Sequence, residues 1–242
     1  MMKKVLVMML ALCLMVIGVG CGGSDSQDAA SSSQASSAQE PASDADDEAD
    51  DEDKDDDYDA KSGDTIVIFF SLAGNANLPD GIDASSRASI VKDGDDVDGN
   101  AEVIADWIAD AKGCDTYEIE TVDKYPADYD ETVDQAQKEQ NDNARPKLEG
   151  DKLDLAKYKN VYLVFPNWWG DMPMALYTFF DEQDFSDKNI TVCVTHGGSG
   201  FSDTISSIKE LEPKATVKEG MDLYDSDVLD SEKDVKDWAK AN

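Results

Sequence analysis

Short apolar runs alternate with segments of helical spacing between residues 65 and 241, and this alternation constrains the fold more than any other feature. The run Thr65–Phe70 (TIVIFF) is apolar at nearly every position, which is typical of a strand covered on both faces. After Asn100, which we expect to cap a helix, apolar residues recur at helical spacing until Gly113. Such alternation predicts a parallel sheet with right-handed crossovers, and hence a three-layer α/β domain.

The same reasoning places the remaining elements, and no internal repeat is visible among them. The expected strands are 65–70, 116–119, 161–165, 190–194 and a weaker fifth at 215–217 or at 220–223. The expected helices are one that begins at Asn100 and stops at Gly113, 129–140, a short helix after Pro173, 202–211 and 231–241.

The first 20 residues have the pattern of a bacterial export signal. Residues 1–4 are short and basic, and residues 5–19 form an apolar stretch too short and wrongly flanked for a membrane span. The sequence around Cys21 (GCGGS) resembles a lipobox, although Gly18 stands where leucine is usual. We therefore expect residues 1–20 to be a lipoprotein signal peptide and Cys21 to be lipidated, which would anchor an extracytoplasmic protein to the cell membrane. The alternative is ordinary secretion with an incidental Cys21.

Residues 21–61 lack the composition of a folded segment. Ser, Ala and Gln dominate as far as residue 42, and residues 44–59 contain twelve acidic residues and one lysine. A segment of this kind buries too little apolar surface to offset the entropy of ordering it, and repulsion between its charges extends it. We expect a disordered tether that holds the following domain, residues 62–242, away from the membrane.

The domain itself is strongly acidic. Residues 61–242 contain 39 acidic and 18 basic residues, a net charge of −21. This charge argues against binding to nucleic acid or to anionic lipid surfaces and would attract a basic protein partner, although a saline habitat would select the same surface. Cys114 and Cys193 are expected on or beside strands too far apart for a disulfide.

Two of the expected strands run directly into loops rich in glycine and aromatic residues. Strand 161–165 leads into residues 166–170 (PNWWG), and strand 190–194 leads into residues 195–200 (THGGSG). Such loops, at the carboxyl ends of neighbouring parallel strands, are where open α/β sheets bind planar cofactors. The first offers a flat hydrophobic surface and the second offers accessible backbone amides, which together suit an isoalloxazine ring. The residues predicted to bind it are Pro166, Asn167, Trp168, Trp169, Gly170, Thr195, His196, Gly197, Gly198 and Ser199.

Two of these assignments have structural alternatives. Trp168 and Trp169 can instead serve only in core or surface packing. His196, the sole histidine, can act as a proton donor to a reduced flavin or bound quinone, or it can shape its loop through hydrogen bonds, the interpretation that we favour.

Several linked motifs resemble the flavodoxins, in particular a short-chain flavodoxin subgroup. They are Tyr125-Pro126 followed by Asp128-Tyr129, the segment 143–146 (NARP), the two glycine-rich loops, and the segment 177–186 (YTFFDEQDFS) between those loops. The resemblance covers roughly residues 65–220. It implies a five-stranded parallel sheet in the order 2-1-3-4-5 and one FMN bound at the strand ends.

The phosphate-binding loop of the flavodoxins, Ser/Thr-x-Thr-Gly-x-Thr, corresponds here to residues 71–76 (SLAGNA), in which both later hydroxyl positions are alanine. Residues 75–98 then intervene before the helix opens. The resemblance assigns the phosphate to Ser71 and to loop and helix amides, and each lost hydroxyl removes roughly 0.5–1.5 kcal/mol of binding free energy. Arg87 in the intervening segment either compensates or is a solvated loop residue. The predicted phosphate-side residues are Ser71, Leu72, Ala73, Gly74, Asn75, Asn100 and Ala101.

The function expected from these features is electron transfer by a surface-tethered, FMN-binding protein. It would act as a carrier that meets a basic redox protein, or as a reductase of a small quinone or nitro compound. The alternative is a non-redox binding module that has kept the fold but lost FMN. No Gly-x-Gly-x-x-Gly sequence follows a strand, so stable NAD binding is unsupported.

Overall fold

A computed structural model describes residues 63–79, 82, 89–93 and 96–242. The expected signal peptide, Cys21, the acidic tether and Arg87 lie outside the described residues. No helix in the described ranges has the length and apolar character needed to cross a membrane.

One five-stranded parallel sheet forms the centre of the domain. Its strands lie in the order β4-β1-β5-β6-β7, which is the predicted order 2-1-3-4-5 counted along this sheet. Phe69 of β1 pairs with Glu118 of β4 on one side and with Val164 of β5 on the other. The predicted fold class is confirmed. The strands of this sheet are β1 (Thr65–Phe69), β4 (Asp115–Glu118), β5 (Asn160–Pro166), β6 (Asn189–His196) and β7 (Thr216–Tyr224).

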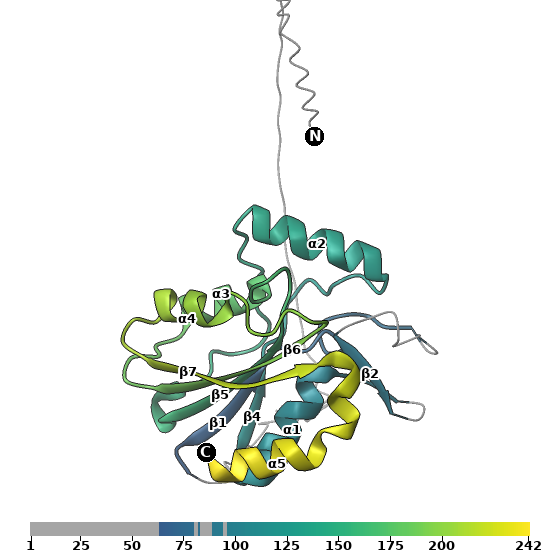
Figure 1. The fold of residues 1–242 in the computed structure, drawn as a ribbon. Coiled ribbons are helices and arrows are strands. Elements are labelled where there is room, and N and C mark those ends of the chain that lie inside the picture. The colour runs from purple at the N-terminus through teal and green to yellow at the C-terminus, as the bar shows by residue number, and fades with distance from the viewer. Residues whose placement is uncertain (1–62, 80–81, 83–88, 94–95) are drawn as a thin grey trace, which may run out of the picture. The chain divides into compact units, whose positions relative to one another are not determined.

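Helices cover both faces of the sheet, as Figure 1 shows. Each face of the sheet has its own hydrophobic core, and alternate residues of β1 belong to opposite cores. Ile66 and Ile68 pack toward α3 and α4, while Val67 and Phe69 pack toward α1 and α5. This alternation explains the continuous apolar run, because both faces of the strand are buried. The helices are α1 (Asn100–Lys112), α2 (Tyr129–Asn141), α3 (Met174–Glu182), α4 (Thr204–Leu211) and α5 (Glu232–Ala241), with 3-10 turns η2 (Leu155–Lys157) and η3 (Asp225–Asp230).

The segment between β1 and α1 contains a hairpin that the sequence analysis did not predict. Strands β2 (Ile90–Asp93) and β3 (Asp96–Gly99) pair antiparallel, and β3 leads directly into α1. The predicted cap Asn100 was wrong by one residue. Gly99 is the N-cap, since its backbone is extended at φ −82° and ψ 135°, and Asn100 is already helical. The predicted stop at Gly113 is confirmed by its left-handed φ of 63°.

Strand β7 unites the two positions that were proposed for a fifth strand. Its pairing with β6 shifts register at Val192 and Cys193, so Gly220 is the extra residue of a β-bulge. A Cβ on Gly220 would lie 2.7 Å from the Val192 carbonyl oxygen, so only glycine fits without a shift. The bulge interrupts the alternation of residues along the strand, which is why the sequence indicated two short candidates.

Cys114 and Cys193 are not joined in a disulfide, as predicted, and both are buried. Cys193 lies on β6, and Cys114 directly precedes β4, three strands away in the sheet.

Candidate functional site

A cavity of about 270 Å³ opens where β5 and β6 end. This volume is close to the lower limit of typical small-molecule sites, roughly 300 Å³. Both glycine-rich loops and the loop after β1 contribute to it, so the structure brings together segments that lie about 120 residues apart in sequence. We call this cavity the ring pocket. Its lining residues are Leu72, Ser89, Tyr129, Thr132, Val133, Ala136, Pro166, Asn167, Trp168, Trp169, Thr195, His196 and Gly197.

The indole of Trp168 is held on three sides while it lines the ring pocket. Phe70 and Tyr125 pack perpendicular to it, with ring centroids at 5.5 and 5.3 Å, and its Nε1 donates a 2.9 Å hydrogen bond to the Ser89 hydroxyl. These contacts fix the ring before any ligand binds, which lowers the entropy cost of binding.

Trp169 is presented differently, at the mouth of the ring pocket. Trp168 and Asp171 exchange backbone hydrogen bonds of 2.9 and 3.1 Å, and both residues between them, Trp169 and Gly170, have positive φ (55° and 80°). This is the signature of a tight two-residue turn, and a left-handed conformation is costly for a residue as large as tryptophan. The turn leaves half of the Trp169 surface exposed.

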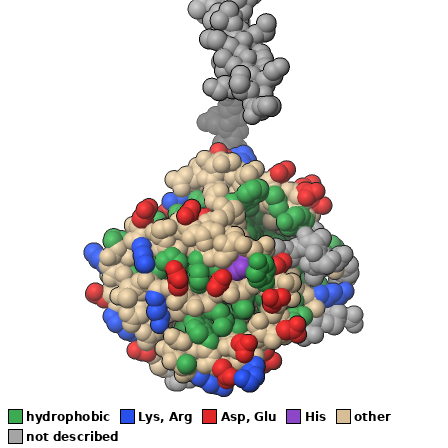
Figure 2. Space-filling view, viewed as in Figure 1, with side chains coloured by type: hydrophobic (Ala, Val, Ile, Leu, Met, Phe, Trp, Pro, Cys, Tyr) green, Lys and Arg blue, Asp and Glu red, His purple; other side chains and the backbone are tan. Residues whose placement is uncertain are grey.

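The loop after β6 is shaped by His196. Its Nδ1 accepts a hydrogen bond of 2.9 Å from the Gly198 amide, and its Nε2 lies 3.2 Å from a carboxylate oxygen of Asp222. This pair of contacts assigns the ring proton to Nε2. The arrangement is the one that the loop-shaping interpretation expects. The ring of Tyr224, half exposed, packs edge-on against the imidazole at 4.8 Å. Figure 2 shows the single histidine, in purple, among hydrophobic and acidic side chains on this face.

Thr195 carries a polar atom that has no partner in the part of the chain that is described. Its hydroxyl oxygen is fully buried and makes no hydrogen bond, although the residue lines the ring pocket. A buried unpaired hydroxyl is costly, and such groups in native structures call for an explanation. A polar edge of a bound ligand would satisfy it.

Asn167 joins the two glycine-rich loops. Its side-chain amide donates to the Gly200 carbonyl at 2.7 Å and accepts from the Gly170 amide at 3.0 Å. These bonds set the spacing of the loops. The backbone of Ser199 takes part in the same loop, since its carbonyl accepts from the Ser202 hydroxyl at 3.0 Å.

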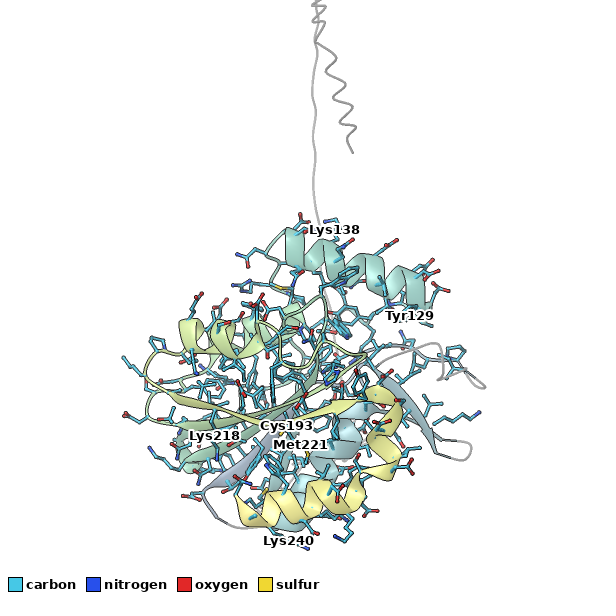
Figure 3. All side chains as sticks on the ribbon, in the orientation of Figure 1. Tyr129, Lys138, Cys193, Lys218, Met221 and Lys240 are labelled. Atoms are coloured by element: carbon cyan, nitrogen blue, oxygen red, sulfur yellow. The ribbon has the colours of Figure 1, made fainter. Side chains whose placement is uncertain are left out.

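Sequence reasoning missed one wall of the ring pocket, which comes from α2. The lining residues Tyr129, Thr132, Val133 and Ala136 follow the spacing i, i+3, i+4, i+7 and so share one helix face. That spacing was the available signal, but the helix is otherwise polar, and the sequence analysis predicted only the helix and no part in the site. Figure 3 shows Tyr129 at one end of α2 and Lys138 toward the other. Ser89, also missed, follows the segment 83–88, which lies outside the described residues.

Several donors of the predicted phosphate site are engaged by the chain itself. The Ser71 hydroxyl accepts from the Ala73 amide at 3.1 Å and lies 3.4 Å from a carboxylate oxygen of Glu102. The same carboxylate oxygen accepts from the Gly99 amide at 3.3 Å, and the Asn100 amide donates to the Ser89 carbonyl at 3.2 Å. Neither Ser71 nor any residue from 99 to 101 lines the ring pocket.

Asn75 is a structural link within this loop. Its side-chain amide nitrogen donates to the carbonyls of Ser71 and Ile119, both at 2.9 Å. Its oxygen accepts from the amide and the hydroxyl of Thr121 at 2.7 and 3.0 Å. These four bonds tie the loop after β1 to the segment after β4, and they leave no side-chain donor of Asn75 for a phosphate.

A second carboxylate, that of Glu118, adjoins the loop from the end of β4. A Cβ on Gly74 would lie 1.9 Å from Oε1 of Glu118, so the carboxylate packs directly against the glycine. Burial, followed by the neighbouring carboxylates Glu102 and Glu120, raises the pKa of Glu118 to about 7. Burial also raises the pKa of Glu102. We call Glu102 and Glu118, with Ser71, Gly74 and Gly99 that they contact, the acidic end of the site.

The ring pocket and the acidic end differ in how well they suit FMN. The ring pocket suits a planar ring system, because it combines a fixed indole, a largely apolar helix face and a hydroxyl that has no partner within the described part of the chain. The acidic end does not suit a phosphate, because carboxylates lie against the loop that should cradle it. No cluster of metal-ligating side chains was found among the described residues.

Comparison with known proteins gave one family and several solved structures. A sequence model described as Flavodoxin matches residues 95–242, which include both glycine-rich loops but not residues 71–76. A search of curated proteins found no match. A candidate flavoprotein from Bacteroides uniformis is 27% identical, with a TM-score of 0.56 over 74% of this chain and 99% of that one. A second, from Bacteroides eggerthii, is 22% identical, with a TM-score of 0.54 over 75% and 97%. A flavoprotein in complex with FMN from Lactobacillus acidophilus is 18% identical, with a TM-score of 0.48 over 70% and 98%.

Proposed function

Because this chain belongs to the flavodoxin family, we propose that it binds a flavin in the ring pocket and transfers electrons through it. The observation that carries this proposal is the convergence of the loops after β1, β5 and β6 with α2 on one cavity. FMN is the flavin that the family resemblance suggests. A bound flavin would supply one- or two-electron chemistry.

The residues of the ring pocket have distinct tasks in this proposal. Trp168 provides a pre-positioned aromatic surface for the ring system. The Thr195 hydroxyl, which has no partner among the described residues, forms a hydrogen bond with a polar edge of the flavin ring. His196 holds the Gly197–Gly198 backbone in place through its two hydrogen bonds and so fixes the amides that face the ligand.

The cellular setting is also part of the proposal. We propose that lipid attached to Cys21 anchors the protein outside the cytoplasm, with the acidic segment as a spacer. The net charge of the domain favours a basic redox protein as the partner, and a small quinone is the alternative acceptor.

A titration tests flavin binding directly. The full chain, purified in a non-ionic detergent, is added to riboflavin and, separately, to FMN, and the quenching of flavin fluorescence is followed. Saturable binding of either flavin, weakened in Trp168→Ala, supports the proposal. If neither flavin binds, the flavin proposal is wrong and the chain is a binding module of another kind.

A second measurement separates a carrier from a reductase. The flavin-loaded protein is mixed with NADH or NADPH in a stopped-flow instrument. Reduction that completes within seconds indicates an enzyme, whereas reduction only by dithionite or by a protein donor indicates a carrier.

A further inference from the structure

We propose that the site takes riboflavin, the flavin without a phosphate, in preference to FMN. This inference rests on the flavin binding proposed above and names the ligand class more closely. It follows from the acidic end of the site, where the chain places its own carboxylates against the loop expected to hold a phosphate.

The first step concerns the donors of that loop. A phosphate is usually bound by hydroxyls and backbone amides at the N-terminus of a helix. Here the Glu102 carboxylate takes this position at the start of α1, within 3.3 Å of the Gly99 amide and 3.4 Å of the Ser71 hydroxyl. An anionic side chain near the helix N-terminus already interacts favourably with the helix dipole. Its negative charge offsets the positive potential that would otherwise attract a phosphate.

The second step concerns the space beside the loop. Glu118 packs so closely on Gly74 that a single added carbon would lie 1.9 Å from its Oε1. That oxygen is buried and has no hydrogen-bond partner in the described ranges of the chain. A group that enters here therefore meets an unsatisfied acceptor, and the partner that such an acceptor needs is a donor.

The third step concerns the charges around Glu118. Glu102 and Asp106 face it from α1, and Glu120 faces it from the segment after β4. Among the described residues, the cation that acts on Glu118 is Lys124, whose ammonium group donates to the Gly74 carbonyl at 3.1 Å. That ammonium group is already paired with Glu120 at 2.7 Å and with Glu149 at 3.5 Å. The local field thus opposes a phosphate dianion.

The fourth step concerns the ligand. Leu72 lines the ring pocket and Ser71 belongs to the acidic end, so a chain that leaves the ring pocket along this loop reaches the carboxylates. The ribityl chain of riboflavin ends in a hydroxyl group, which can donate a charge-assisted hydrogen bond to Glu118 or Glu102. The phosphate of FMN has two negative charges near neutral pH and offers acceptors where donors are needed.

The test compares dissociation constants for the two flavins in the same protein. The full chain in detergent is titrated with riboflavin and with FMN at pH 8, and the ratio of the two constants is determined. The expected result is that riboflavin binds more tightly. In the double variant Glu102→Gln and Glu118→Gln the ratio shifts toward FMN by about tenfold or more, since two repulsive charges are removed. Glu210→Gln, an exposed change on α4, leaves the ratio unchanged.

The outcomes separate this inference from the proposed function. FMN binding as tightly as riboflavin at pH 8, or more tightly, overturns the inference and supports the general flavin proposal. An unchanged ratio in the double variant also overturns it. Binding of neither flavin overturns both. The variants are more decisive than acidification, because the phosphate itself gains a proton near pH 6.

Discussion

The ring pocket and the acidic end lie along the same loop after β1, yet they are built on opposite principles. In the ring pocket the polar groups are arranged around a cavity, and the Thr195 hydroxyl has no partner among the described residues. At the acidic end the Ser71 hydroxyl and the amides of Ala73 and Gly99 bond within the chain, and two carboxylates lie close together, one of which, Glu118, keeps an oxygen without a partner in the described ranges. The difference shows that a fold can keep the part of a site that recognises a ring while it rebuilds the part that recognises a charge.

The largest effect on stability is expected at Asn75, which supports the loop after β1 that links the ring pocket to the acidic end. Asn75→Ala removes four hydrogen bonds and leaves two carbonyls and an amide buried without partners. We expect the free energy of unfolding to fall by about 4 kcal/mol, measured by urea denaturation. Thr121→Val keeps the backbone bond to Asn75 and loses the hydroxyl, which lies 3.0 Å from both Asn75 Oδ1 and the Asp123 carbonyl, so it should cost about 1 kcal/mol. Equal losses in both variants would show that Asn75 is not the organising residue.

Trp168 is expected to support both the stability of the domain and the affinity of the ring pocket for flavin. Trp168→Ala removes two edge-to-face contacts and the bond to Ser89, which should lower the free energy of unfolding by about 3 kcal/mol and flavin affinity by at least about tenfold. Trp169→Ala, at the exposed rim, should change stability by less than about 0.5 kcal/mol. The contrast would disappear if denaturation midpoints fell equally in the two variants.

A smaller loss is expected where the hairpin meets α1. In Gly99→Ala the new Cβ would lie 1.8 Å from the Ser71 hydroxyl, so the acidic end must shift, at a cost of about 2 kcal/mol. Gly197→Ala, in the ring pocket, places its Cβ in open space and should cost less than about 0.5 kcal/mol. Thermal denaturation of the two variants checks this, and similar midpoints would contradict the tight packing at Gly99.

The smallest effect has the opposite sign and depends on pH. The pKa of Glu118 is raised to about 7 in the folded protein from an ordinary value of 4.5, so the folded state holds a proton that the unfolded state has lost. Stability contributed by this proton is fully present below pH 4.5 and is lost as the pH rises to about 7. Glu118→Gln should therefore be more stable than the parent at pH 8, by only about 1 kcal/mol because the side chain is partly exposed. The gain should vanish at pH 4, and a gain independent of pH would refute this explanation.

Sequence patterns predicted the sheet and the ring-side loops because those features are local. An apolar run of five residues already indicates a strand buried on both faces, and the loops 166–170 and 195–200 follow such runs directly. The hairpin β2–β3 escaped prediction because its strands are four residues long and one of them (DVDG) is mostly polar.

The acidic end could not be predicted for a different reason. Glu102 and Glu118 are 16 residues apart, and each is unremarkable in its own element: one lies in the first turn of a helix, the other at the end of a short strand. Only the crossover from α1 to β4 brings them together beside Gly74. The proximity of the two carboxylates results from tertiary packing and not from any sequence motif.

The bulge at Gly220 has a consequence for how copies of this protein meet. Strand β7 lies at the margin of the sheet, with one row of backbone groups free to pair with a strand from another molecule. A bulge twists such a margin, and exposed Lys218, Glu219 and Asp222 add charge along it. We therefore expect little self-association through this strand.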